Sequence, residues 1–407
     1  MEQTLISIEQ AEAYMREYLT TIAAARKPLA QCGGRVLREV VIAERQQPPF
    51  DRVMMDGIAI NSGDFAAGMR EFTIIGTQAA GQKPIQLEGE GSCIEIMTGA
   101  VLPIACDAVI PVERISVNNS RAMVEDDLEV CAGQYIHAQG SDYPAEQVLL
   151  NPGVQIQAPE MAIIASAGLA EVLVSPDLSC GIISLGDELI TPGAPVADHQ
   201  IRRSNDFAVA AALAARGDVF THCYPVADKP KDVAEKVEKV LTENDFLVLC
   251  GGVSKGKFDF VPALLADLGV NKVFHGIAQR PGKPFWFGVA SNGKPVFALP
   301  GNPVSVLACA ARYLLPAIDS LRGLNGHSVS KFALADAVDS PAAMGWLLAV
   351  QLVAADDGSL VAKPCFTNTS GDFAGLAGAA GIVELPANQQ HFPAGYKAGF
   401  YSWGSLL

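Results

Sequence analysis

Basic residues are scarce in this chain of 407 residues. It has 29 lysines and arginines against 44 aspartates and glutamates, which gives a formal net charge of −15. Because nucleic acids and anionic membranes attract basic surfaces, this balance argues against either as the main partner. The sequence also lacks any run approaching the roughly 18 apolar residues that cross a bilayer. A local basic pocket for a small ligand remains compatible with the composition.

Paired cysteines are missing as well. The nine cysteines are scattered, and none belongs to a C-x-x-C pair. Neither a disulfide framework nor a zinc site is therefore expected, and a reducing cytoplasm is the expected location. Glu2 and Glu9 stand where a signal peptide would be basic and then apolar, which supports the same expectation. The six histidines show no H-E-x-x-H or other ligand spacing, and no Ser-His-Asp or Cys-His nucleophile follows from the spacing.

The N-terminal region predicts an amphipathic helix. Ser7 and Gln10 have the spacing of a capping box, in which two side chains cap the first N–H groups of a helix. Apolar residues then recur at helical spacing, at Ile8, Ala11, Met15, Leu19 and Ile22. Such an apolar face needs a partner, which is either the rest of the same protomer or a second copy of the chain.

Changes in amino-acid composition and in the pattern of apolar residues divide the chain into four expected parts. Residues 48–138 consist of short β-rich runs between Gly, Pro, Asn and Asp, which predicts an inserted β module. Residues 1–47 and 139–175 flank it and are expected to form one discontinuous linker or dimerisation domain. Residues 176–325 alternate strands with helices of ten to fifteen residues, which predicts a three-layer α/β domain with a mainly parallel sheet. Residues 326–407 are expected to form a C-terminal β-barrel-like domain.

A glycine-rich loop and a second helix start predict an anion site in the α/β part. Gly251–Lys257 follows an apolar strand, so its glycines can turn tightly and expose N–H groups to a ligand. Asn302 is a suitable N-cap and Pro303 fits the first helical position, which predicts another exposed helix N-terminus. Arg280 with Lys283 places two fixed cations near a turn. Together these features favour a phosphorylated ligand, although the loop is neither a Walker A sequence nor a G-x-G-x-x-G fingerprint.

Acidic residues stand at the ends of expected strands, where ligands bind to parallel sheets. Asp187 and Glu188 end a strand, and Asp228 precedes a helix, but solvation alone would explain these positions. Asp259 follows the glycine loop and has two compatible interpretations, as a helix cap or as a ligand of a divalent cation. Asp206 is expected to cap the helix at 207–215.

Three polar residues in or beside the β module have simple structural explanations too. Asp56 lies in an expected turn, although two methionines beside an acid are unusual on a surface. Asp142 lies in an expected loop. Thr98 either ends a strand or offers a hydroxyl to a ligand.

Ordered motifs cover nearly the whole chain. They are Pro48–Asp51, Met55–Gly57, Ile96–Ala100, Asp107–Val109, Gly186–Leu189, Gly251–Ser254, Pro281–Pro284 and Leu299–Ser305. In this order they resemble the MoeA family, the molybdopterin molybdenumtransferases related to the gephyrin E domain. The resemblance implies an elongated homodimer whose active site lies between the α/β part of one protomer and the β module of the other. It also implies a reaction that passes molybdate into the dithiolene of adenylylated molybdopterin (molybdopterin-AMP) and releases AMP, with Mg²⁺ assisting.

The resemblance assigns roles to individual residues. The phosphates would be cradled by Gly251, Gly252, Ser254, Gly301, Asn302 and Ser305. Phosphate or molybdate charge would be neutralised by Arg280 and Lys283. Magnesium would be held, and the pyrophosphate oriented, by Glu188, Asp228 and Asp259, with Glu188 and Asp259 as the metal ligands. The neighbouring protomer would contribute Asp56, Thr98 and Asp142.

The chain departs from the family pattern at several positions. The differences are Arg52-Val53 in place of a polar pair, Leu185 in place of a threonine, Lys255 and Lys257 in the glycine loop, Gly276 in place of a lysine, and no arginine within 346–350. One alternative is therefore a non-catalytic relative that binds molybdopterin or a protein partner, such as a molybdoenzyme or a cofactor-pathway protein, as a scaffold. A nucleotide hydrolase that shares only the α/β domain is another, but the β module and the final β domain argue against it.

Overall fold

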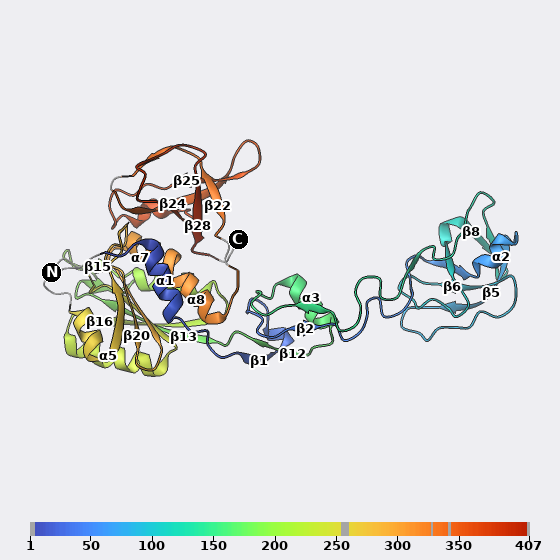
Figure 1. Cartoon of the computed structure of the whole chain (residues 1–407), viewed down its shortest axis with the longest axis horizontal. Helices are drawn as coiled ribbons and strands as arrows, with labels where there is room; N and C mark the ends of the chain where they lie inside the picture. Colours follow the sequence, from blue (N-terminus) through green and yellow to red (C-terminus); the bar gives the residue numbers. More distant parts are fainter. Residues whose placement is uncertain (1–4, 254–259, 327–328, 341–342, 405–407) are drawn as a thin grey trace. The chain divides into compact units, whose positions relative to one another are not determined.

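A computed structural model describes residues 5–253, 260–326, 329–340 and 343–404 (Figure 1). Internal contacts divide the chain into two compact units. The first unit comprises Met1–Glu39, Pro152–Met161 and Ala170–Leu407, and the second comprises Val40–Asn151 and Ala162–Leu169. Each unit is described by itself.

The first unit is centred on a six-stranded sheet with the order β16-β13-β17-β21-β20-β18. The strands are β13 (Leu178–Leu185), β16 (Val219–Val226), β17 (Phe246–Cys250), β18 (Val270–His275), β20 (Trp286–Ala290) and β21 (Pro295–Leu299). The first four strands in the sheet are parallel neighbours, whereas β20 and β18 pair antiparallel. This arrangement confirms the expected mainly parallel sheet, and it brings the carboxyl ends of four strands to one edge.

Helices cover both faces of this sheet, which makes three layers (Figure 1). Successive side chains of β17 point to opposite faces, so Phe246 and Val248 enter one core while Leu247 and Leu249 enter the other. The first core is covered by α4 (Asn205–Ala214), α7 (Pro303–Cys309), a π-helical turn (Ala310–Leu314) and α8 (Leu315–Arg322). The second is covered by α5 (Pro230–Glu243) and α6 (Val261–Asp267).

The N-terminal helix α1 (Ile8–Tyr18) begins with the expected capping box between Ser7 and Gln10. Its apolar face is buried in the first core of the same chain, through Ile8, Ala11 and Met15. Of the two partners that the pattern allowed, the structure therefore shows the same protomer.

The expected cap of α4 is wrong. The N-cap residue is Ser204, whose side chain makes no capping hydrogen bond. Asp206 lies inside the first turn, fully buried, and forms an ion pair with Arg203 at 3.2 Å. The helix dipole stabilises a carboxylate in the first turn, and Arg203 adds a positive charge beside it. Asp206 therefore lies buried within the first turn instead of capping the helix.

Although it is not a continuous apolar run, since it contains Arg312, Asp319 and Arg322, the helical segment Pro303–Arg322 is long and apolar enough to cross a membrane by length and composition alone. In the structure 83% of its most apolar window is buried. It packs against the sheet, which explains its apolar composition as that of a core helix.

The last part of the first unit is a closed barrel of five strands (Figure 1). The strands are β22 (Lys331–Leu334), β24 (Gly345–Ala354), β25 (Leu360–Pro364), β26 (Gly381–Leu385) and β28 (Lys397–Ser402). Pairing runs β24-β25-β22-β28-β26 and returns to β24, so the ring is complete. The short strand β19 (Gln279–Arg280) adds to β24 and joins the barrel to the turn that carries the predicted cations. The expected barrel-like fold is confirmed.

Short elements complete the first unit. They are β1 (Ala25–Pro28) paired with β12 (Glu171–Val174), β14 (Leu189–Ile190) paired with β15 (Ile201–Arg202), β23 (Val338–Asp339) paired with β27 (His391–Phe392), and the 3-10 turns η1 (Leu29–Gln31) and η4 (Phe373–Leu376). Helix α3 (Ala158–Ser166) contains residues of both units.

The second unit is built on a six-stranded sheet with the order β7-β4-β6-β5-β9-β8. The strands are β4 (Gly57–Ile60), β5 (Glu71–Gln78), β6 (Ser92–Ile96), β7 (Ala108–Pro111), β8 (Ile115–Asn118) and β9 (Arg121–Val124). The other elements are α2 (Ser62–Ala66), η2 (Val112–Arg114), β3 (Arg52–Val53) paired with β10 (Ile136–His137), and β2 (Val41–Ile42) paired with β11 (Val148–Leu150). The β-rich character that the sequence predicts for residues 48–138 is found within this unit.

Gly57 is required by the close approach of two strands in this sheet. A Cβ added to Gly57 would lie 1.9 Å from the carbonyl oxygen of Ile110. We expect Gly57→Ala to lower the free energy of unfolding of the second unit by about 1–3 kcal/mol, because the backbone of β7 would have to move. Gly68→Ala is the matched control, because Gly68 also has a positive φ but has no atom within 4 Å of its added Cβ. Hydrogen exchange of β4 and β7 measures the effect, and equal protection in both variants would contradict it.

Candidate functional site

The turns that follow β17 and β21 lie against each other at the carboxyl edge of the parallel sheet. The N–H of Gly251 donates to the carbonyl of Leu299 at 3.1 Å. A Cβ added to Gly301 would lie 3.9 Å from Cα of Gly251, and one added to Gly251 would lie 3.1 Å from the carbonyl oxygen of Leu185. The structure therefore brings two of the predicted phosphate-binding turns together.

Gly252 also packs closely against the start of α6. Gly252 has a φ of +73°, and a Cβ there would lie 2.5 Å from Cγ2 of Val261. His275 Nε2 lies 3.0 Å from the carbonyl oxygen of Val253, and because a carbonyl only accepts, Nε2 carries the proton. Two of the predicted site residues, Ser254 and Asp259, lie outside the described residues.

Carboxylates gather at the same edge of the sheet. Asp187 Oδ1 accepts a hydrogen bond from the N–H of Asp228 at 3.1 Å, which joins the loops after β13 and β16. Glu188 turns back over Gly186, where an added Cβ would lie 2.7 Å from its Oε2. All three carboxylates are exposed. Within the described ranges no group of three or more His, Cys, Asp or Glu residues is placed to hold a metal ion.

A cavity of about 690 Å³ lies between the turn that carries Arg280 and Lys283 and the barrel strand β24. Both cations are exposed, and neither forms an ion pair with any residue in the described part of the chain. Ser305 lines the same cavity and is 5% exposed. The barrel contributes further polar residues: Asp339, Thr367, Asn368, Thr369 and Ser370. Unpaired cations beside hydroxyl and amide groups form a suitable binding place for an oxyanion.

The turn with the two cations is held by buried contacts. Gln279 is 1% exposed, accepts a hydrogen bond from the hydroxyl of Tyr313 and donates to the carbonyl of Gly282 at 3.3 Å. Gly282 has a positive φ, and a Cβ there would lie 2.4 Å from Sγ of Cys309. Burial raises the pKa of Tyr313 well above its ordinary value, so its hydroxyl remains a donor. The cations therefore stand on a turn with little freedom to move.

Asn302 is the N-cap residue of α7, as the sequence predicts, but its side chain does not cap the helix. Its amide donates to Ser370 Oγ at 2.8 Å, and the N–H of Val304 donates to the carbonyl of Ser370 at 3.1 Å. Asn205 donates to the carbonyl of Gly301 at 2.8 Å. Sequence reasoning missed Asn205 and Ser370, because no local pattern marks contacts between residues 68 or more positions apart.

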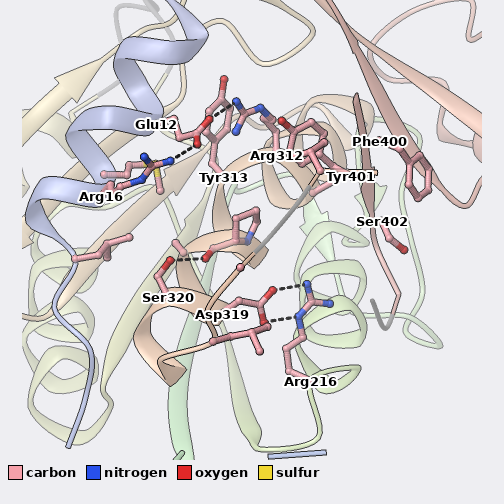
Figure 2. Close-up of a pocket in the computed structure, with 18 of the residues that line it drawn as sticks. Glu12, Arg16, Arg216, Arg312, Tyr313, Asp319, Ser320, Phe400, Tyr401 and Ser402 are labelled. Carbon is pink, nitrogen blue, oxygen red and sulfur yellow. Dashed lines mark hydrogen bonds and ion pairs between the residues drawn. The ribbon is translucent and has the colours of Figure 1, made fainter. Parts of the chain in front are cut away.

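A second cavity in the first unit differs in its charges. It measures about 530 Å³ and lies between α1, α8 and β28 (Figure 2). Its arginines are already paired: Arg312 contacts Glu12 at 2.7 Å, and Arg216 contacts Asp319 at 3.1 Å through two nitrogens. Because these cations are neutralised by the chain itself, the cavity beside Arg280 is the better candidate for an anionic ligand.

In the second unit, Asp56 is fixed by Thr98. Asp56 Oδ1 accepts hydrogen bonds from the backbone N–H of Thr98 at 2.6 Å and from its hydroxyl at 2.7 Å. These two bonds lower the pKa of Asp56 below its ordinary value. Asp56 therefore presents an ionised, exposed carboxylate at neutral pH. Asp142 lies in the same unit, with Oδ1 2.8 Å from Nε2 of His137.

We expect Thr98→Val to raise the pKa of Asp56 toward its ordinary value of 3.8, because one of its two hydrogen bonds is lost. The lowered pKa means that the stabilisation is fully present above the unfolded-state pKa and is lost as the pH falls through the folded-state pKa. Carboxyl ¹³C NMR during an acid titration measures the shift. Asp357, whose pKa is lowered in the same way by Ser359, is the internal control and should not change. An unchanged pKa of Asp56 would contradict the prediction.

The fold and the site define a class of protein: an α/β domain with glycine turns at its parallel edge, joined to a β-barrel and carrying a β module. Family models match two stretches of the chain. The MoeA N-terminal region (domain I and II) matches residues 6–168, and a probable molybdopterin binding domain matches residues 181–320. A molybdopterin molybdenumtransferase of Synechocystis sp. is 37% identical, over 91% of this chain and 93% of its own length. The chain belongs to this family of enzymes of molybdenum cofactor biosynthesis, which confirms the resemblance.

Another relative and a solved structure are similar to the chain over most of its length. A molybdopterin molybdenumtransferase of Bacillus subtilis is 30% identical, over 90% of this chain and 85% of its own length. A solved structure, the molybdopterin biosynthesis MoeA protein from Pyrococcus horikosii, is similar with a TM-score of 0.80 and 26% identity, over 99% of this chain and 100% of that one.

Proposed function

We propose that this enzyme passes molybdate into the dithiolene of molybdopterin supplied in adenylylated form, and that AMP is released. The observation that carries the proposal is the cavity beside Arg280 and Lys283, whose two exposed cations have no ion pair within the described part of the chain. Family membership supports the substrate class. The nine free cysteines support a cytoplasmic site of action.

In the proposed complex the phosphates bind the turns at Gly251 and Gly301. The N–H of Gly251 is bonded to Leu299, so the donors to the phosphates are the N–H groups of Gly252 and Gly301, together with the hydroxyl of Ser305. Arg280 and Lys283 neutralise phosphate or molybdate charge, because hydrogen bonds between ionised groups are stronger than those between neutral ones.

The proposal includes magnesium because carboxylates are exposed at the carboxyl edge of the parallel sheet. Mg²⁺ is usually held by one or two carboxylates and completed by water and substrate phosphates, so a set of three protein ligands is not required. The exposed oxygens of Glu188 fit that chemistry, with Asp228, whose N–H is bonded to Asp187, and Asp259 as the further predicted residues. When bound, the ion supplies positive charge to the phosphates. Glu188 and Asp228 would otherwise repel the substrate, so their role depends on this charge.

An assay with purified enzyme, adenylylated molybdopterin, molybdate and Mg²⁺ tests the function. We expect AMP release that depends on molybdate, together with molybdenum bound to the pterin. Pterin binding without AMP release would favour the alternative, a non-catalytic scaffold for molybdopterin or for a protein partner.

We also propose that the enzyme is a homodimer, with Asp56, Thr98 and Asp142 of one copy acting at the site of the other. The ionised, exposed carboxylate of Asp56 supports a role at a ligand.

Mixing two inactive variants tests this proposal. Asp56→Asn and the double variant Arg280→Ala with Lys283→Ala are each expected to lose nearly all activity, whereas chains unfolded and refolded together should regain about a quarter of the wild-type activity. The reason is that half of the random dimers are mixed, and one of the two sites in each mixed dimer is intact. The control is the same pair of proteins mixed without subunit exchange. No recovery after exchange would contradict a shared site.

A further inference from the structure

Two side chains of the second unit form a hydrogen-bonded line that ends at Asp142. The strands β3 and β10 pair antiparallel, with His137 opposite Arg52. Arg52 Nη2 lies 3.0 Å from His137 Nδ1, and His137 Nε2 lies 2.8 Å from Asp142 Oδ1. Arg52 and His137 are partly buried, whereas Asp142 is 44% exposed. The imidazole thus lies between a cation and a carboxylate.

The chemistry of these groups decides the tautomer of the imidazole. A guanidinium only donates hydrogen bonds, so the contact from Arg52 requires a lone pair on Nδ1 of His137. The neutral imidazole then carries its proton on Nε2, which donates to Asp142. Arg52 therefore selects the tautomer that can orient the carboxylate, in the way that a partner of one ring nitrogen sets the role of the other.

The backbone around Asp142 is anchored separately. The N–H of Asp142 donates to the carbonyl of Gln47 at 2.8 Å, and the N–H of Gln139 donates to Asp51 Oδ1 at 2.8 Å. These bonds hold the loop but leave the carboxyl group free to rotate. Among the described residues only His137 donates to the side chain of Asp142, and it uses Oδ1, so Oδ2 is left for a ligand.

We infer that Arg52 and His137 are positioning residues that hold the carboxylate of Asp142 in one orientation for the transferase reaction. This inference rests on the proposed function and on the predicted role of Asp142. It also explains Arg52, which stands where the family pattern has an uncharged polar residue. In this chain Arg52 sets the tautomer of His137, and His137 sets the orientation of the carboxylate of Asp142.

The first test reads the tautomer and needs no activity. The full-length protein is labelled with ¹⁵N at its histidine rings, and the signal of His137 is assigned by its loss in His137→Gln. We expect the Nε2–H tautomer at pH 7.5, and a shift toward a mixture of tautomers in Arg52→Met. An Nδ1–H tautomer or an imidazolium in the wild type would overturn the inference, whether or not the enzyme transfers molybdenum.

The second test reads the effect on catalysis. We expect His137→Leu to lower kcat by about 10- to 100-fold with little change in KM, as expected for a misplaced catalytic group. His137→Gln should recover most of the activity, because its amide offers an N–H donor from nitrogen and an acceptor on oxygen, and the neutral imidazole likewise has a donor nitrogen and an acceptor nitrogen. In Asp142→Asn, the addition of His137→Leu should cost less than about twofold, since His137 acts through Asp142.

The outcomes separate the two proposals. Additive losses in the double variant, or no recovery in His137→Gln while the protein remains folded, would overturn the positioning role. His222→Leu is the control, since His222 is exposed on the edge strand β16 and should leave kcat unchanged. A wild type without AMP release would refute the proposed function, and the NMR test would still decide the tautomer.

Discussion

Asp218→Ala is expected to lower the free energy of unfolding of the first unit by about 3–5 kcal/mol, because it leaves a buried arginine with too little negative charge. Asp218 Oδ1 lies 2.7 Å from Arg322 Nε, and the two side chains are 1% and 0% exposed. Asp319 contacts both Arg322 and Arg216, the latter pair visible in Figure 2. Two buried arginines therefore share two buried aspartates, and removal of one carboxylate leaves a net positive charge in the core.

Tryptophan fluorescence during urea unfolding measures this effect, because all three tryptophans, at 286, 346 and 403, belong to the first unit. Asp177→Ala is the matched control. Asp177 pairs with Lys27 at 2.8 Å and with Arg35 at 2.5 Å, but its side chain is 41% exposed and Arg35 also donates to two backbone carbonyls, so the loss of Asp177 should cost only about 1 kcal/mol. The double variant Asp218→Leu with Arg322→Met should be less destabilised than Asp218→Ala, since it removes a complete ion pair. Similar costs for Asp218→Ala and Asp177→Ala would refute the prediction.

Removal of both cations beside the proposed site, Arg280→Ala with Lys283→Ala, is expected to lower kcat/KM for AMP release by roughly 10²- to 10⁴-fold. A hydrogen bond to a charged group contributes about 1.5–3 kcal/mol, so two such bonds correspond to about 3–6 kcal/mol. The fold should be unaffected, because both side chains are exposed and form no ion pair within the described residues. Steady-state kinetics at several molybdate concentrations measure the loss.

The control for this experiment is Lys272→Ala. Lys272 is exposed on β18 of the same sheet and does not line the cavity. The control separates a specific loss from a general change in the charge of the enzyme, and it should retain full activity. If the double variant also kept its activity, the anion would have to bind elsewhere.

Local signals in the sequence were enough for most of the fold. The alternation of strands and helices, the turn at Gly251 and the capping box at Ser7 depend on neighbouring residues, and each is found in the structure. The cap at Asp206 was mistaken, because burial beside Arg203 outweighed the local capping preference. A one-dimensional pattern does not reveal which cation will lie within reach of a carboxylate.

The candidate site was predictable only in its residue types. Glycines and cations at the right places indicated a ligand with phosphate groups, but not which charges the fold would neutralise. Nothing in the sequence distinguishes the charge state of Arg280 from that of Arg312. In the structure Arg312 is paired with Glu12 and Glu384, whereas Arg280 lines an open cavity. Residues such as Ser370 and Asn205 gave no signal, since their contacts join distant parts of the chain.

The amino-acid sequence by itself determined the succession of elements, the glycine turns at the sheet edge and the family, because backbone preference and motif order are properties of short segments. Tertiary structure alone decided which charged groups are paired in the core and which are left for a ligand. It also decided how Asp56 and Asp142 are oriented. Asp56 is bonded to Thr98, 42 residues away in the chain. Asp142 is bonded to His137, 5 residues away, and His137 contacts Arg52, which is 85 residues from it. The physical reason is that a hydrogen bond depends on distances of about 3 Å in space, and only the packed chain sets those distances.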